Sequence, residues 1–170
     1  MAHQKNLELI VNIHNEVHCA IWVDEMRLKQ ILQNLLNNAI KFTQKGQIEL
    51  EVSSTNINDS SSKIKFSVKD TGIGIKKGNK KKILEAFTQE DNSTTRNYGG
   101  TGLGLTISNS LLKLMNSKLE IDSEPNVGST FRFELELKSE FCNNYFNTNK
   151  HNFKKALIIE DNQLVASLIQ

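Results

Sequence analysis

The spacing of apolar residues changes period along the chain, and this change limits the folds that the chain can adopt. Within residues 28–40 apolar side chains recur at steps of three and four, which predicts an amphipathic helix. Within 48–68 they alternate with polar residues on both sides of a turn-rich stretch, which predicts a β-hairpin. Helical spacing returns at 107–115, and a second alternating pair occupies 119–137.

The order of these elements favours one fold class. A short apolar segment at 7–11 is expected to add an edge strand, so the order is strand, helix, hairpin, long loop, helix, hairpin. Hairpins that alternate with helices favour an α+β sandwich, in which helices cover one face of a mostly antiparallel sheet. The same order disfavours a doubly wound parallel sheet.

The chain divides into three parts by composition. Residues 1–138 are predicted to form one domain, a size that can bury a real core. Residues 139–153 are rich in Asn and poor in apolar residues, which predicts a linker. Residues 154–170 hold an apolar strand followed by Glu160 and Asp161, and are too short to fold alone. We therefore expect an excised fragment.

Charge and cysteine content exclude several classes of protein. A net charge of +2 gives no reason to expect a nucleic-acid or membrane partner. Cys19 and Cys142 lack any C-x-x-C spacing, which argues against a disulfide framework or a zinc site. Because no apolar run approaches the ~20 residues needed to span a bilayer, we expect a cytoplasmic fragment.

The first predicted helix carries a polar stripe beside its apolar one. Asn34, Asn38 and Lys41 follow at i, i+4 and i+7, with Arg27 on the same side. An Asn side-chain oxygen suits Mg²⁺, which takes few protein ligands because it also binds phosphates and water. A solvated outer helix face is an equally good interpretation of this stripe alone.

A carboxylate closes the second predicted strand. Asp70 continues the alternation of the inward-facing residues before it, so its side chain is expected to point toward the core. A buried carboxylate needs a donor, and the exocyclic amine of a purine is one. Gly72 and Gly74 would let the backbone approach such a ligand, although D-x-G-x-G alone is also a common turn after a strand.

A glycine-rich segment precedes the second predicted helix. Residues 99–105 would place free backbone N–H groups at a helix N-terminus, which favours phosphate. The long polar loop before it contains Arg96, which could reach a phosphate if the loop closed over a nucleotide. A disordered linker is the alternative. Ser129 shares inward parity with the apolar residues after it, so it and Asp70 could reach one pocket.

These segments together resemble the conserved boxes of sensor histidine kinases, most closely those of the hybrid type. Residues 24–43 look like the N box, 70–75 like the first glycine box, 85–89 like the F box, 100–105 like the second glycine box, and 128–131 like the last. The resemblance implies a Bergerat-type two-layer α/β sandwich with a mostly antiparallel mixed sheet. Lys76 and Leu84 depart from the family pattern, but neither has an assigned role.

The resemblance also implies roles for single residues. Asn38 would chelate Mg²⁺ with Asn34 beside it, Lys41 would contact phosphate, Phe42 would lie near the nucleotide, and Asp70 would bind the adenine amine.

Further residues would complete the two ends of the nucleotide site. The adenine pocket would be shaped by Gly72, Gly74 and Ile75 and completed by Ser129. The ATP lid would comprise Arg96, Gly100, Thr101, Gly102, Leu103 and Gly104.

The implied function is transfer of the γ-phosphoryl group of ATP to a histidine of a separate dimerisation and phosphoacceptor domain in two-component signalling. Catalysis would rest on positioning and charge, with Asn34, Lys41 and Arg96 as catalytic residues and Mg²⁺ as cofactor. None of the four histidines has the acceptor context. Residues 156–161 resemble the first strand of a receiver domain. Without dimerising helices a monomer is expected.

Two other functions compete with this interpretation. ATP-hydrolysing members of the same superfamily place a glutamate base where this chain has Asn34, and an amide cannot take a proton from water. A degenerate module that binds ATP without transferring phosphate is the second alternative. Turnover separates it from an active kinase.

Overall fold

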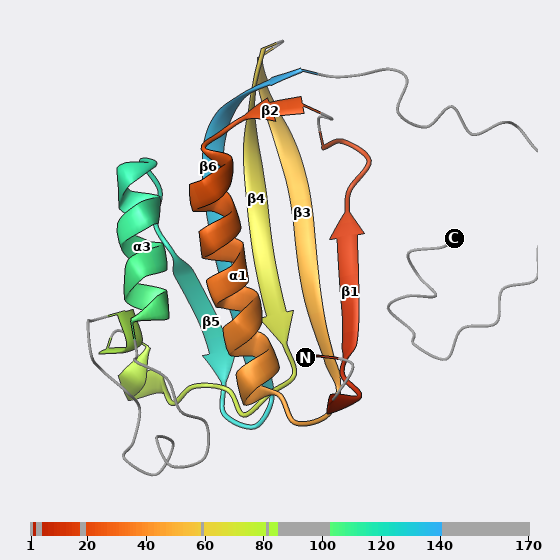
Figure 1. The fold of residues 1–170 in the computed structure, drawn as a ribbon, viewed down its shortest axis with the longest axis vertical. Coiled ribbons are helices and arrows are strands. Elements are labelled where there is room, and N and C mark those ends of the chain that lie inside the picture. The colour runs from red at the N-terminus through yellow and green to blue at the C-terminus, as the bar shows by residue number, and fades with distance from the viewer. Residues whose placement is uncertain are drawn as a thin grey trace, which may run out of the picture.

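The structure is a computed structural model, and it describes residues 2, 5–17, 20–58, 60–80, 82–84 and 103–140. Figure 1 shows the arrangement of its helices and strands. The elements are β1 (Glu8–Ile13), β2 (Ala20–Trp22), α1 (Glu25–Phe42), β3 (Gln47–Asn58), β4 (Ser61–Asp70), η2 (Lys77–Asn79), η3 (Lys82–Leu84), α3 (Gly104–Leu114), β5 (Glu120–Glu124) and β6 (Gly128–Glu140).

The strands form one mixed sheet in the order β1-β3-β4-β6-β2, and β5 also pairs with β6. Only β1 and β3 run parallel among these pairs, whereas the others are antiparallel. Helices α1 and α3 lie side by side on the same face of the sheet (Figure 1). This arrangement confirms the predicted α+β sandwich with helices on one face of a mostly antiparallel sheet.

Both predicted hairpins form, as β3–β4 and β5–β6. The segment predicted as an edge strand is β1, at one end of the sheet. Strand β2 was not predicted, because three residues are too few to show a period. Strand β6 continues through Ser139 and Glu140, the first two residues of the predicted linker. The rest of the linker and residues 154–170 lie outside the described residues.

Helix α1 is fixed at both ends by side chains. At its start, the Asp24 carboxylate accepts hydrogen bonds from the Arg27 backbone N–H at 3.1 Å and from Arg27 Nε at 2.9 Å. At its end, Lys5 Nζ donates to the carbonyl oxygens of Ile40 at 2.7 Å and Lys41 at 3.2 Å. An ammonium there satisfies carbonyls that the helix leaves open and complements the helix dipole. None of the helices in the described ranges is long and apolar enough to span a bilayer.

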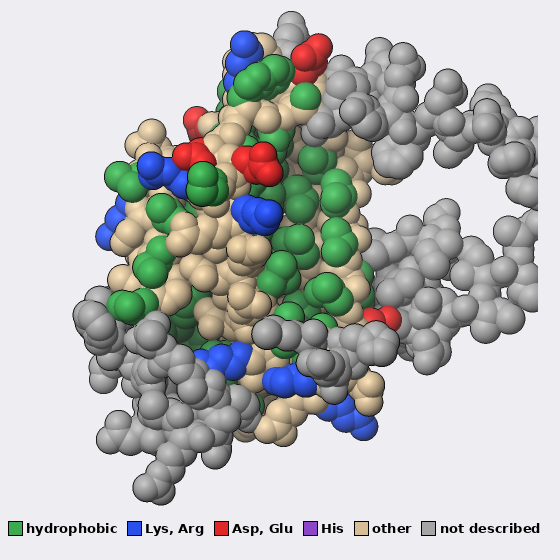
Figure 2. Space-filling view, viewed as in Figure 1, with side chains coloured by type: hydrophobic (Ala, Val, Ile, Leu, Met, Phe, Trp, Pro, Cys, Tyr) green, Lys and Arg blue, Asp and Glu red, His purple; other side chains and the backbone are tan. Residues whose placement is uncertain are grey.

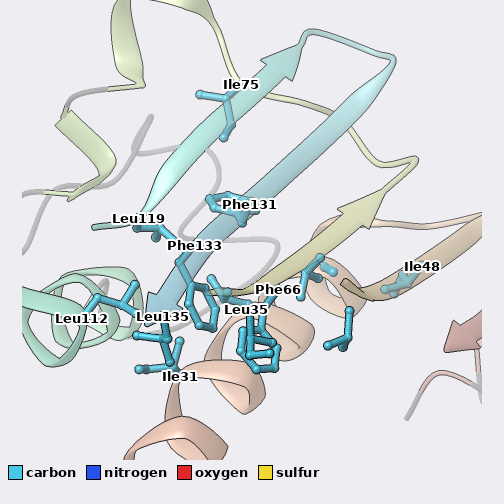
Figure 3. Packing of buried hydrophobic residues seen from close by; sticks show 14 of the residues in the cluster. Ile31, Leu35, Ile48, Phe66, Ile75, Leu112, Leu119, Phe131, Phe133 and Leu135 are labelled. Carbon is cyan, nitrogen blue, oxygen red and sulfur yellow. The ribbon is translucent and has the colours of Figure 1, made fainter. Parts of the chain in front are cut away.

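The core lies between the helices and the inner face of the sheet (Figure 3). Ile31 and Leu35 of α1 are fully buried against it. Phe66 of β4 and Phe133 of β6 are register partners, and their rings stack with centroids 5.0 Å apart. The inward residues of the strands therefore follow the predicted alternation.

The helical layer does not cover the whole sheet. On β1, Leu9, Val11 and Ile13 point to the same face as Ile48 of β3, yet they are 50%, 56% and 60% exposed. Figure 2 shows hydrophobic side chains gathered on this face of the sheet beside α1. The two helices thus cover the central strands and leave β1 exposed on this face. The candidate site residues of α1 belong to the covered part.

The turn into β6 requires glycine. Gly128 has φ +139°, and a Cβ built there would run into the carbonyl oxygen of Asp70 on the neighbouring strand. We expect Gly128→Ala to lower the free energy of unfolding by at least about 2 kcal/mol, because both the dihedral and the contact become strained. Urea unfolding measures this change.

Gly78→Ala is the matched control for that substitution. A Cβ at Gly78 meets no atom within 4 Å, and its φ lies outside the left-handed region. We therefore expect this change to alter the free energy of unfolding by less than about 1 kcal/mol. Equal effects of the two substitutions would contradict the packing that the structure assigns to Gly128.

Candidate nucleotide-binding site

The buried carboxylate predicted at the end of β4 is present. Asp70 is 5% exposed and follows the inward positions of Ile64, Phe66 and Val68 on the same strand. Its Oδ1 accepts a hydrogen bond from the Gly72 backbone N–H at 2.8 Å. An acidic group therefore closes the inner face of the sheet at the end where β4 stops.

The environment of Asp70 disfavours its charged form. Burial raises the pKa of Asp70 above its ordinary value, while hydrogen bonds from the backbone N–H groups of Gly72 and Ser129 oppose this rise. The net effect is a raised pKa. A ligand that brought a further donor to this carboxylate would lower the cost of holding the charge there.

Three polar side chains form one row across β4, β6 and β5. In register, Asp70 pairs with Ser129, and Ser129 pairs with Ser123. The Ser123 and Ser129 hydroxyl oxygens lie 3.1 Å apart, and the Ser129 residue is 7% exposed. The predicted approach of Ser129 to Asp70 thus arises from direct pairing of their strands.

Sequence reasoning did not identify Ser123. Its hydroxyl oxygen accepts a hydrogen bond from the Ile75 backbone N–H at 2.8 Å and donates to the Gly128 carbonyl at 2.9 Å. The alternation that places Leu119 and Ile121 on the inner face also places Ser123 there. That parity was the available signal, but it does not show which backbone groups the hydroxyl meets.

The first glycine box connects α1 to the β5–β6 turn. On one side, the Ile73 N–H donates to the carbonyl of Phe42, the last residue of α1, at 3.3 Å. On the other side, the Asn126 N–H donates to the Ile73 carbonyl at 2.8 Å. A Cβ at Gly72 would lie 2.5 Å from the Phe42 carbonyl oxygen, so this approach depends on glycine.

A second glycine of this box is equally constrained. Gly74 has φ +66°, and a Cβ there would collide with the Glu124 carbonyl at the end of β5. The box therefore brings the predicted adenine-pocket residues Gly72, Gly74 and Ile75 between the end of α1 and the end of β5. The structure thus joins segments that are separate in sequence.

The polar stripe of α1 is present, but its residues make different contacts. The Asn34 amide nitrogen donates to the Gly104 carbonyl at 3.3 Å and to Ser108 Oγ at 3.2 Å, both on α3. The Asn38 side chain is half-buried and has no hydrogen-bond partner among the described residues. Arg27, expected on the same side, pairs with Asp24 at the start of α1.

Lys41 lies at the last turn of α1, beside the first glycine box. Its Nζ sits 4.7 Å from the centroid of the Phe42 ring, within range of a cation–π contact. Burial lowers the pKa of Lys41 below its ordinary value. An incoming anion would favour the ammonium form, so the position suits a phosphate contact.

The donor set of α1 fits a magnesium ion that is shared with a phosphate ligand. Within the described ranges, no group of three or more His, Cys, Asp or Glu side chains could hold a metal. Magnesium does not need such a cage, since one or two protein oxygens suffice when phosphates and water supply the others. The half-buried Asn38 amide can supply one of those oxygens.

The described part of the predicted lid is its C-terminal end. Leu103 is the N-cap of α3 and Gly104 is its first residue, which contacts Asn34. The F box at 85–89 and the residues Arg96, Gly100, Thr101 and Gly102 lie outside the described residues. The structure therefore places the described end of the predicted lid beside Asn34 of α1.

Residues 23–139 match the family described as histidine kinase-, DNA gyrase B- and HSP90-like ATPase. The chain belongs to this family. The match spans α1 and β3 to β6 and includes every described residue of the candidate site.

Two proteins with similar sequences are histidine kinases of signal transduction. The chain is 41% identical over 136 residues to the signal transduction histidine-protein kinase BarA of Escherichia coli K12, covering 80% of this chain and 15% of that protein. It is 43% identical over 133 residues to hybrid signal transduction histidine kinase B of Dictyostelium discoideum, covering 78% and 7%. The chain thus spans a small part of the curated relatives that it matches.

A solved structure supports the same assignment. The crystal structure of full-length ShkA in complex with AMPPNP aligns with a TM-score of 0.70 at 33% identity, over 83% of this chain and 28% of that one. Together these matches confirm the resemblance to hybrid-type sensor histidine kinases and the predicted fold. They do not address the start of a receiver domain.

The raised pKa of Asp70 predicts a pH-dependent stability. Below the unfolded pKa of about 3.9 the carboxyl is neutral in both states, and stability is lost as pH rises through the higher folded pKa. We expect Asp70→Asn to be more stable relative to the parent chain at pH 7 than at pH 4. Urea unfolding at the two pH values measures the difference.

Asp122→Asn controls for the general effect of removing a carboxylate, because that side chain on β5 is 72% exposed. A stability gain for Asp70→Asn that is the same at pH 4 and pH 7 would contradict the assigned cost of burying the charge.

Proposed function

We propose that this domain binds Mg-ATP and transfers its γ-phosphoryl group to a histidine of a separate dimerisation and phosphoacceptor domain in two-component signal transduction. The observation that carries the proposal is the buried Asp70 carboxylate, held beside the end of a helix whose polar stripe fits Mg²⁺ and phosphate. Membership of an ATPase family with histidine kinase relatives supports the choice of ligand and reaction.

The adenine would bind at the end of β4. Asp70 would accept a hydrogen bond from the exocyclic amine, and this added donor offsets the burial that raises its pKa. Gly72, Gly74 and Ile75 would form the wall of the pocket, since their backbone is fixed between α1 and β5. Ser129 would complete this end from β6.

The phosphates would bind between the end of α1 and the start of α3. Lys41 would contact a phosphate oxygen with Phe42 beside the nucleotide, and Asn38 would hold Mg²⁺ with Asn34 beside it. When bound, Mg²⁺ supplies charge neutralisation to the phosphates.

The lid would cover the phosphates from the α3 side. Its residues would be Arg96, Gly100, Thr101, Gly102, Leu103 and Gly104, of which the last two stand at the N-terminus of α3. That end of a helix favours anions because its first N–H groups are open.

In the transfer step, the bond between the γ-phosphorus and the bridging oxygen of ADP breaks, and a bond forms between that phosphorus and an imidazole nitrogen. The imidazole attacks through the lone pair of its unprotonated nitrogen, ADP leaves with the electron pair of the broken bond, and the proton on the other imidazole nitrogen passes to water. The chain's contribution is positioning and charge stabilisation by Asn34, Lys41 and Arg96. No histidine in this sequence has the acceptor context, so the acceptor belongs to another domain.

Hydrolysis of ATP is a poorer fit to the same site. A water-activating base is needed, and the position that holds a glutamate in hydrolysing relatives is Asn34 here. The Asn34 amide donates to Gly104 and Ser108, a role in which it takes up no proton. Phosphotransfer to a positioned histidine needs no such base.

The remaining architecture follows from this proposal. A receiver domain would begin at residues 154–170, after a linker, and would accept the phosphoryl group from the histidine. The domain would act in the cytoplasm, as a monomer when separated from the dimerising helices, and without nucleic-acid or membrane contact by this part of the chain.

A mutant of the proposed metal ligand tests this function. We expect Asn38→Ala to lower the rate of phosphotransfer from ATP to a supplied dimerisation and histidine domain by at least about tenfold, because a magnesium ligand is lost. Transfer of radiolabel from [γ-³²P]ATP measures the rate.

Asn37→Ala is the matched control, since Asn37 is the neighbouring asparagine and its side chain is exposed. It should transfer at the parent rate. If the parent chain binds ADP but transfers no phosphate to the supplied domain, the degenerate binding module is the correct function.

A further inference from the structure

The Ser123 hydroxyl lies between the first glycine box and the start of β6, and none of the roles proposed above includes it. Its oxygen contacts the Ile75 N–H at 2.8 Å, the Gly128 carbonyl at 2.9 Å and the Ser129 hydroxyl at 3.1 Å. We infer that Ser123 determines base specificity, because it fixes the Ser129 hydroxyl as a hydrogen-bond acceptor toward the nucleotide base. This inference rests on the proposed function and deepens it.

The number of protons that each group can donate determines the direction of these hydrogen bonds. A serine hydroxyl has one proton to donate and two lone pairs with which to accept. The Ser123 oxygen accepts from the Ile75 N–H, which can only donate. The Gly128 carbonyl can only accept, so the Ser123 proton is directed there. The two hydroxyl oxygens of Ser123 and Ser129 lie 3.1 Å apart, and either hydroxyl could donate in this contact. Because the single Ser123 proton is used by Gly128, the proton in this contact is assigned to Ser129.

The Ser129 hydroxyl consequently has no proton left for a ligand. Among the described residues, Ser123 is the hydrogen-bonding partner of this hydroxyl, and the lone pairs of Ser129 remain available. Ser129 is paired in register with Asp70, whose carboxylate is also an acceptor. Two adjacent side chains would therefore present acceptors to the base.

A pocket that presents two acceptors favours a purine with an amine at C6 over a purine with a carbonyl at C6. A 6-amino group has two protons and can donate to both acceptors. A 6-oxo group places a third acceptor against them, and the N1–H beside it can donate to only one of the two side chains. Asp70 supplies part of this discrimination by itself. The part that depends on Ser123 is the orientation of the Ser129 hydroxyl, which could otherwise rotate and donate to a 6-oxo group.

Ser123 is thus a positioning residue that acts through Ser129. A purely structural role, in which Ser123 merely supports the Ile75 N–H, would weaken binding of all purine nucleotides equally. The ratio of affinities for two bases separates these cases. ADP and IDP are suitable probes, because inosine differs from adenosine in carrying the 6-oxo group and the N1–H that accompanies it.

The test is calorimetric titration of ADP and of IDP into the parent chain, Ser123→Ala, Ser129→Ala and the double variant. We expect the parent to prefer ADP, and Ser123→Ala to reduce the ratio of ADP to IDP affinity by about threefold to tenfold, the range of one hydrogen bond. In the Ser129→Ala background, Ser123→Ala should leave the ratio unchanged, since the group it positions is absent.

Two controls accompany this cycle. Ser123→Thr keeps the hydroxyl and should retain the parent ratio. Ser54→Ala removes a buried hydroxyl on β3 that has no hydrogen-bond partner within the described part of the chain, and it should also leave the ratio unchanged.

The outcomes separate this inference from the proposed function. If the parent and Ser123→Ala bind ADP with the same preference over IDP, the specificity role is wrong while ATP binding stands. If Ser123→Ala weakens both nucleotides by one factor, Ser123 is only structural and the inference is again wrong. If the parent chain binds no ADP at all, the proposed function fails and this inference fails with it.

Discussion

The carboxylate of Asp70 lies almost fully buried at the end of β4, and much of the surrounding structure accommodates it. Two backbone N–H groups, from Gly72 and Ser129, offset part of the burial that raises its pKa. Gly128 must be glycine because the backbone of Asp70 occupies the space of its Cβ. A charge held in this way costs stability in the free protein, and a ligand that brings a donor recovers part of that cost.

The glycine box after Asp70 links this carboxylate to the rest of the site through backbone hydrogen bonds. Its backbone is hydrogen-bonded to the end of α1 through Phe42 and to the β5–β6 turn through Asn126. The polar stripe of α1 therefore stands at a fixed place relative to the carboxylate. Asn34 extends the same arrangement to α3, where its amide contacts Gly104 and Ser108. The proposed base end and the proposed phosphate end of the candidate site are thus parts of one connected structure.

Apolar periodicity predicted α1, α3 and both hairpins, and strand parity predicted that Asp70 and Ser129 point inward. Those features depend on local sequence alone. Strand β2 was missed because its pairing with β6 is a long-range contact of only three residues. Ser123 was missed because its importance lies in three partners that only the folded hairpin brings together. The orientation of Asn34 toward α3 likewise depends on how two helices pack, which the helical stripe does not reveal.

The most direct test of the account is whether an adenine nucleotide needs the buried carboxylate. Calorimetric titration of ADP into the parent chain and into Asp70→Ala, with and without Mg²⁺, answers this. We expect saturable binding by the parent and a loss of at least about tenfold in the affinity of Asp70→Ala, since a hydrogen bond to a charged group is removed. Equal affinity of the two chains would contradict it, and would place the nucleotide somewhere other than the end of β4.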